Sequence, residues 1–295
     1  METEPQRLVG EHEFFCCSSR VQIKDGRITV LTEPRIAHCP LHEALYGTEE
    51  VDKAAVKRSV EMRVQDFGFC CEQRVFNDSM VVPYGSSEVI SVCMKKGLLD
   101  YAVTVCEGAG TVITSNPDLV QAIGARLSGI VRTSPIGNTI EYIKSKGGTI
   151  LDENLAKIDH KEGVIKAAEL GGHNIAVTVA SFNSDQIEEI RIAGKEKAVN
   201  VAIFSVCNTC ADSSDVRRIL SSADVVCASA SRLVREQIGP KALMQLGVAI
   251  PVFALTELGK RLLLSYLMEF DESLVAFRTK KLPYIVGEKS PKLKE

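Results

Sequence analysis

Short, nearly continuous apolar runs alternate with amphipathic segments along most of this 295-residue chain. The runs are rich in Val and Ile and cover residues 101–105, 129–131, 175–179, 199–206, 225–228 and 250–255. Strands that are buried on both faces have this composition. Between them, Asn116-Pro117 and Ser134-Pro135 are typical helix starts. The pattern predicts an α/β fold with a mostly parallel sheet flanked by helices, similar to a Rossmann-like domain.

The first 80 residues follow a different pattern. Residues 21–31 alternate around Asp25-Gly26, which is a strong hairpin signal, and valines recur at helical spacing between residues 51 and 65. We therefore divide the chain into a cysteine- and histidine-rich α+β module (residues 1–80), an α/β domain (81–268) and a basic C-terminal tail (269–295). From residue 278 the tail has six Lys or Arg against two Glu, which favours a solvated segment or one that docks to a partner.

The chain contains ten cysteines, and their redox state depends on the compartment. The charged N-terminus lacks the apolar core of a secretory signal, and the longest apolar run, residues 262–268, is far shorter than the roughly 20 residues of a membrane helix. We expect a cytoplasmic protein with reduced thiols and no membrane span. A net charge of −3 and 5% aromatic residues argue against nucleic-acid binding. The oligomeric state is open, with a homo-oligomer as one expectation.

Ligands of parallel sheets bind beyond the carboxyl ends of the strands, where helix N-termini converge. The candidate ligand-binding residues at these ends are Glu107, Gly108, Gly110, Thr133, Ser134 and Ser229. The glycines of the segment 106–111 would let a backbone approach a ligand closely, although this segment is neither a dinucleotide fingerprint nor a P-loop. The alternative is that the Ser and Thr side chains cap helices and that the glycines form a structural turn.

The cysteine pattern points to thiolate chemistry. Cys207-x-x-Cys210 follows a predicted strand and precedes a helix start, which lowers the pKa of nearby thiols. We expect Cys207, Cys210 and Cys106 to form a soft ligand set for zinc or an iron–sulfur cluster. Cys16, Cys39 and Cys70, with His12, His38 and His42, would complete this set or hold a second metal. Redox exchange and purely structural thiols are the alternatives, and Cys93 and Cys227 are predicted to be core residues.

Several stretches carry a resemblance to a known family: residues 105–113 (Val-Cys-Glu-Gly-Ala-Gly-Thr-Val-Ile), 119–129, 133–136 (Thr-Ser-Pro-Ile) and 250–256 (Ile-Pro-Val-Phe-Ala-Leu-Thr). They resemble the methanogenesis marker protein 8 family over about residues 10–270. The resemblance implies an anaerobic archaeal cytoplasm and a role near methyl-coenzyme M reductase, in its maturation, activation or cofactor supply. It supplies no catalytic residues.

Three functions are therefore expected as alternatives. The first is a metal- or cluster-binding accessory protein that works with the methyl-coenzyme M reductase assembly machinery. The second is an α/β enzyme that acts on a small anionic or nucleotide substrate at the strand ends. The third is a scaffolding subunit whose cysteines have no chemical role.

Overall fold

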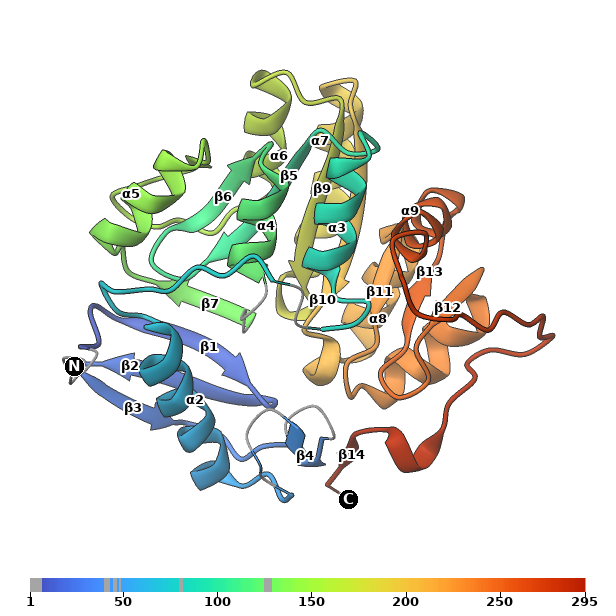
Figure 1. Ribbon diagram of the computed structural model, residues 1–295, viewed down its shortest axis with the longest axis horizontal. Coiled ribbons are helices and arrows are strands. Elements are labelled where there is room, and N and C mark those ends of the chain that lie inside the picture. Colours follow the sequence, from blue (N-terminus) through green and yellow to red (C-terminus); the bar gives the residue numbers. More distant parts are fainter. Residues whose placement is uncertain are drawn as a thin grey trace.

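An eight-stranded sheet forms the centre of the computed structural model, which describes residues 7–39, 43–44, 47, 49–79, 82–124 and 129–294 (Figure 1). The strand order is β12-β13-β11-β10-β9-β5-β6-β8. The four middle strands run parallel: β11 (Val225–Cys227), β10 (Asn200–Val206), β9 (Asn174–Ala180) and β5 (Tyr101–Cys106). These strands correspond to the apolar runs in the sequence, and the α/β class is confirmed.

Both edges of this sheet are antiparallel, so the sheet is mixed and the expected mostly parallel arrangement holds only for its centre. The edge strands are β6 (Gly110–Thr114), β8 (Thr149–Ile150), β12 (Met244–Leu246) and β13 (Val252–Ala254). Residues 107–109 close a hairpin between β5 and β6. Gly108 and Gly110 both have a positive φ, and a Cβ on Gly110 would lie 2.2 Å from the Ala156 carbonyl oxygen. These glycines therefore serve a tight turn and a close backbone approach.

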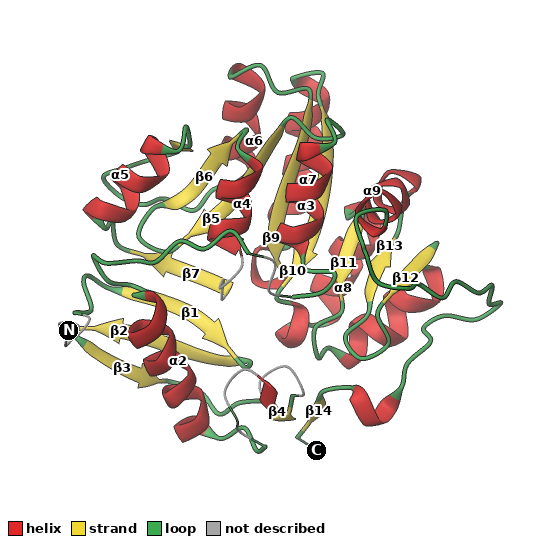
Figure 2. Cartoon of the chain, viewed as in Figure 1, coloured by secondary structure: helices red, strands yellow, loops and turns green. Residues whose placement is uncertain are grey.

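Helices cover both faces of the central sheet (Figure 2). One face packs against α6 (His160–Glu169), α7 (Gln186–Glu196) and α8 (Ser213–Ser222), and the other against α3 (Ser86–Lys95), α4 (Pro117–Gly124) and α9 (Glu257–Leu267). Side chains of β9 alternate between these layers, with Val177 in the first core and Ala176 in the second. Burial of apolar side chains on both faces stabilises the three-layer arrangement.

A second, four-stranded antiparallel sheet lies beside the carboxyl ends of the parallel strands (Figure 1). Its order is β3-β2-β1-β7, with β1 (His12–Cys16), β2 (Ser19–Lys24), β3 (Arg27–Val30) and β7 (Gly129–Thr133). The hairpin at Asp25-Gly26 is confirmed, and both residues have a positive φ. The run at 129–131 is a strand as expected, but it pairs with β1 rather than with the central sheet. The first 80 residues thus share their sheet with a strand from the following region, and a separate N-terminal module is not shown.

The remaining elements join these sheets. They are β4 (Ile36–His38), α2 (Lys53–Phe67), α5 (Gly137–Ser145), β14 (Lys292–Leu293), a π-helix (Val234–Ile238) and the short 3₁₀ segments Ser181–Asn183, Asn208–Cys210, Gly239–Lys241 and Gly287–Lys289. Strand β14 pairs with β4, which brings the end of the tail back to the N-terminal region. None of the described helices is both long and apolar enough to cross a membrane.

Candidate functional site

A cavity of about 360 Å³ lies between the carboxyl ends of the parallel strands and the second sheet. Thr104 of β5, Thr178 of β9 and Val206 of β10 line it on the side of the central sheet. The turn between β1 and β2 lines the opposite side. We call this space the inner cavity. It occupies the position at which open parallel sheets bind ligands.

Six of the ten cysteines line the inner cavity, and they come from four separate parts of the chain. They are Cys16 and Cys17 at the β1–β2 turn, Cys39 after β4, Cys207 and Cys210 after β10, and Cys227 at the end of β11. Cys210 reaches across to the second sheet, where its Sγ lies 3.5 Å from the Ser18 carbonyl oxygen. The fold thus gathers thiols that are up to 211 residues apart in the sequence around one space.

The backbone at this cavity is held in sparsely populated conformations. Cys17, Ser18, Cys207 and Ser229 have φ values of 49°, 68°, 53° and 51°, which L-residues other than Gly, Asn and Asp seldom adopt. All four line the inner cavity. Cys17 and Ser18 form the two-residue turn of the β1–β2 hairpin, which requires a positive φ at both positions. Cys207 and Ser229 follow β10 and β11, and they keep this conformation because the surrounding structure holds them in it.

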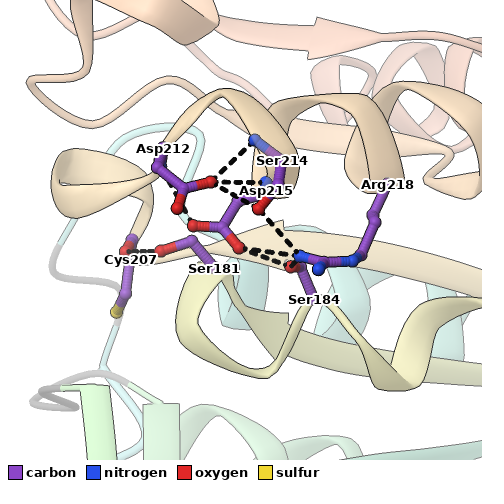
Figure 3. Close-up of polar contacts among 7 residues, drawn as sticks. All are labelled: Ser181, Ser184, Cys207, Asp212, Ser214, Asp215 and Arg218. Carbon is purple, nitrogen blue, oxygen red and sulfur yellow. Dashed lines mark hydrogen bonds and ion pairs between the residues drawn. The ribbon is translucent and has the colours of Figure 1, made fainter.

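A hydrogen-bond network fixes the loop that carries Cys207 and Cys210 (Figure 3). The Ser181 hydroxyl donates to the Cys207 carbonyl oxygen (3.1 Å), and Ser184 donates to Asp215 (2.8 Å). Asp212 and Asp215 form a capping box at the start of α8. The Cys207 side chain points away from this network in Figure 3. The network therefore positions the Cys207 backbone and leaves its sulfur on the cavity side.

Cys16 and Cys17 form a coupled pair of thiols. Their sulfurs are 3.9 Å apart, and a hydrogen bond from Cys17 lowers the pKa of Cys16 to about 6, with a further contribution from the Arg63 guanidinium. The same hydrogen bond and burial raise the pKa of Cys17. Of the two thiols, Cys16 therefore ionises first, and Cys17 keeps its proton.

The thiols after β10 and β11 behave in the opposite way. Burial raises the pKa of Cys207 to about 12 and also raises the pKa of Cys210 and of Cys227. The expected lowering at Cys207 and Cys210 by the following helix is wrong, because the loss of solvation outweighs the helix end. These three thiols are neutral at pH 7.

The other charged groups of the inner cavity are Arg63 of α2 and Glu88 of α3. Glu88 is already engaged, since it accepts hydrogen bonds from the Val82 N–H, the Ser87 hydroxyl and the Gln121 amide. Helix α3 begins at the cavity with Gly85 as its N-cap, a residue that has no side chain to cap the helix. Arg63 and the positive end of α3 favour an anion, and the negative Glu88 carboxylate in the first turn of α3 opposes one.

Cys70, Cys106 and Glu107 belong to a second buried group, outside the lining of the inner cavity. Arg74 and Glu107 form an ion pair whose side chains are 2% and 1% exposed. Burial raises the pKa of Glu107, and it raises the pKa of Cys106 and Cys70 well above their usual range. The Cys106 thiol donates to the Glu107 carbonyl oxygen (3.2 Å). Cys106 therefore lies with Cys70 rather than with Cys207 and Cys210.

The remaining predicted ligand-binding residues have structural contacts in this fold; Ser229 also lines the inner cavity, and its hydroxyl accepts a hydrogen bond from the Asn208 N–H (3.2 Å). The Thr133 hydroxyl accepts a hydrogen bond from the Gly108 N–H (2.7 Å) and contacts the His12 ring nitrogen Nδ1 (2.7 Å). The Ser134 hydroxyl accepts a hydrogen bond from the Glu11 N–H and donates one to the Glu11 carbonyl oxygen. These contacts join β7 to β1 and to the β5–β6 turn.

A protein-bound zinc ion needs at least three side-chain ligands around one point. Within the described residues, no group of three or more His, Cys, Asp or Glu side chains is placed to hold one ion. His12 is buried against Thr133, His38 pairs with Glu43, and His42 lies outside the described residues. Among the described residues, the thiols in these positions do not fit the expected ligand set.

Sequence reasoning missed Arg63, Thr104 and Thr178, and it assigned Cys227 to the core. Arg63 lies on an amphipathic helix, where an isolated charge is usually solvated. Cys227 is half-buried and lines the cavity, whereas Cys93 is fully buried as predicted. The signal in the sequence was the number of thiols near predicted strand ends. It indicated a shared thiol site but did not identify the other residues that line it.

Fold and cavity define a three-layer α/β protein with a thiol-lined cavity at the carboxyl ends of its parallel strands. Residues 13–268 match a family described as an uncharacterized protein conserved in archaea, DUF2099, and the chain belongs to this family. An uncharacterized protein of Methanocaldococcus jannaschii is 38% identical over 275 residues, which cover 93% of this chain and 95% of that protein.

Proposed function

We propose that the inner cavity binds a small anionic substrate and holds the Cys16 thiolate against it, as in an α/β enzyme that uses a thiolate nucleophile. The observation that carries the proposal is the convergence of Cys16, Arg63 and the N-terminus of α3 on one cavity at the strand ends. Arg63 and the helix end would hold the anionic group. Cys17 would stabilise the thiolate through its hydrogen bond.

The neutral thiols have a different role in this proposal. Cys207, Cys210 and Cys227 are protonated at neutral pH, so they would surround the substrate as polarizable, weakly polar side chains. The hydroxyls of Thr104 and Thr178 are 3.2 Å apart at the floor formed by β5 and β9 and offer hydrogen bonds to the same substrate. The site therefore combines one charged nucleophile with a low-polarity wall.

Charge selectivity of thiol alkylation tests the proposal. We expect the ratio of the alkylation rate with iodoacetate to the rate with iodoacetamide to be higher for Cys16 than for free glutathione, because Arg63 attracts the carboxylate of iodoacetate. Arg63→Gln should lower this preference at least about fivefold, corresponding to ~1 kcal/mol of charge attraction. Site-resolved mass spectrometry under anaerobic conditions measures both rates.

Two variants control this experiment. Arg63→Lys keeps a positive charge and should keep most of the preference. Arg58→Gln removes an exposed arginine of the same helix and should change nothing. An unchanged preference in Arg63→Gln would contradict anion binding at this position.

A second candidate function is supported by the six thiols around one cavity. Under this proposal the protein is an accessory factor that binds zinc or an iron–sulfur cluster after its thiols rearrange. Metal analysis and an absorption spectrum of anaerobically purified protein test it. A content of bound iron or zinc that falls at least about twofold in Cys207→Ser/Cys210→Ser, but not in Cys93→Ser, would support this candidate. Wild-type protein that is purified without metal would exclude it.

The cellular setting is part of the proposal and rests on the resemblance to the methanogenesis marker protein 8 family. It supports an anaerobic, reducing cytoplasm, in which ten free thiols are stable. There the protein would assist methyl-coenzyme M reductase through its maturation, activation or cofactor supply. Co-purification with components of that assembly machinery tests this setting.

A further inference from the structure

A second cavity, of about 1270 Å³, adjoins the inner one. It lies between the β12–β13 edge of the central sheet and residues 274–291 of the C-terminal tail. We call it the outer cavity. The residues that line both spaces are Ile36, Cys39, Val82, Gly85, Thr209, Cys227 and Ser229. The two cavities therefore meet beside the thiols.

The tail crosses the outer cavity as a strap that is fixed at both ends. Helix α9 precedes it, and beyond the cavity Tyr284 N–H donates to the Gln245 side chain (2.9 Å) and Val286 N–H to the Val248 carbonyl oxygen (3.1 Å). Strand β14 then pairs with β4. Between these anchors the ribbon runs outward past β12 and returns (Figure 1). All residues from 271 to 281 are exposed.

Apolar side chains of the strap line the outer cavity without being covered by the protein. Val275 is 90% exposed and Phe277 is 61% exposed, and Leu274 is also exposed. Leu243 is exposed on the opposite wall, next to β12. A ligand with an apolar body would bury these facing side chains, which is favourable in proportion to the area removed from water.

The charges of the outer cavity have one sign. Among the described lining residues every charged side chain is a cation, namely Arg278, Lys280, Lys281 and Lys289. A groove that is lined by one sign of charge concentrates ligands of the opposite sign. The outer cavity thus offers an apolar wall and a cationic strap, and it leads to a thiol-lined space that contains Arg63.

We propose that the two cavities form one site for an elongated ligand with an apolar body and an anionic group, carboxylate or phosphate, at each end. One anionic end lies at Lys280 and Lys281, the apolar body lies along the β12–β13 edge, and the other end lies beside Arg63 and Cys16. This inference rests on the proposed function, because it extends the anion site of the inner cavity.

Linear dicarboxylates of two lengths test the proposal. Dodecanedioate should slow the alkylation of Cys16 by iodoacetamide at a concentration at least about tenfold lower than butanedioate, because in the proposed site the ligand spans from the strap lysines to Arg63. Dodecanol, which has the apolar body without anionic ends, should protect at least about tenfold less well than dodecanedioate. Equal protection by the long and short diacids, or by dodecanol and dodecanedioate, would overturn the proposal.

Variants of the strap localise the second anion site. Lys280→Gln/Lys281→Gln should raise the half-saturating concentration of dodecanedioate at least about threefold, while the matched surface pair Lys195→Gln/Lys197→Gln should leave it unchanged. The surface pair Lys195→Gln/Lys197→Gln should not alter the iodoacetate preference of Cys16. If Cys16 of the wild-type protein shows no preference for iodoacetate, the inner anion site is refuted. If the preference is present but Lys280→Gln/Lys281→Gln does not change the half-saturating concentration of dodecanedioate, only the elongated ligand is refuted.

Discussion

Replacement of Arg74 by Met is expected to lower the free energy of unfolding by about 3–5 kcal/mol, because it leaves the buried Glu107 carboxylate without its counter-ion. Burial already raises the pKa of Glu107 while Arg74 lowers it, so the variant should favour the protonated acid. The protonated form needs no counter-ion, and the loss of stability should therefore be smaller at pH 5 than at pH 8. Urea unfolding at both pH values measures the effect.

Arg232→Met is the matched control. Arg232 pairs with Glu236 on the surface, where its side chain is largely exposed, and the change should lower the free energy of unfolding far less than Arg74→Met does. The double variant Arg74→Met/Glu107→Leu should recover much of the loss, since it removes both charges. If Arg74→Met cost no more than Arg232→Met, the assignment of Arg74 and Glu107 to a buried ion pair would fail.

Replacement of Cys17 by Ala is expected to raise the pH midpoint for alkylation of Cys16 from about 6 by more than about one unit, toward the ordinary thiol value near 8.5. Cys17 supplies the hydrogen bond that stabilises the Cys16 thiolate, and Ala has no donor. Cys17→Ser keeps a donor and should keep a midpoint nearer to the wild type. An identical midpoint in the Ala and Ser variants would show that Cys17 does not stabilise the thiolate.

The sequence predicted the secondary structure well and the sheet partners less well. Runs such as residues 175–179 and 199–206 are strands because continuous β-branched side chains suit a strand covered on both faces. The run at 129–131 has the same local pattern, yet it pairs with β1. Local composition predicts a strand but does not specify which strand lies beside it.

The glycines at 108 and 110 were candidates for a ligand-binding strand end, with a structural turn as the alternative, and they form a hairpin turn. Both uses need glycine at a positive φ, so the residue type alone does not distinguish them. The β6 strand that follows was missed for the same reason, because the glycines were assigned to a loop.

Part of the candidate site was predictable from the thiols. Cys16, Cys39, Cys207 and Cys210 were all named, and the fold brings them to one cavity. Their protonation was not predictable, because the pKa of each thiol depends on burial and on its hydrogen-bond partner. Arg63 was missed because its role depends on α2 lying against the cavity, a tertiary contact without a sequence signal.

The rate of alkylation of Cys16 by iodoacetamide in the wild-type protein, measured between pH 5 and pH 9 under anaerobic conditions, tests the central claim most directly. The thiolate is the reacting form, so the rate should rise with pH through a midpoint of about 6 and level off near neutrality. A midpoint near 8.5 or above, or no reaction of Cys16 in the folded protein at any of these pH values, would contradict a thiolate poised in the inner cavity.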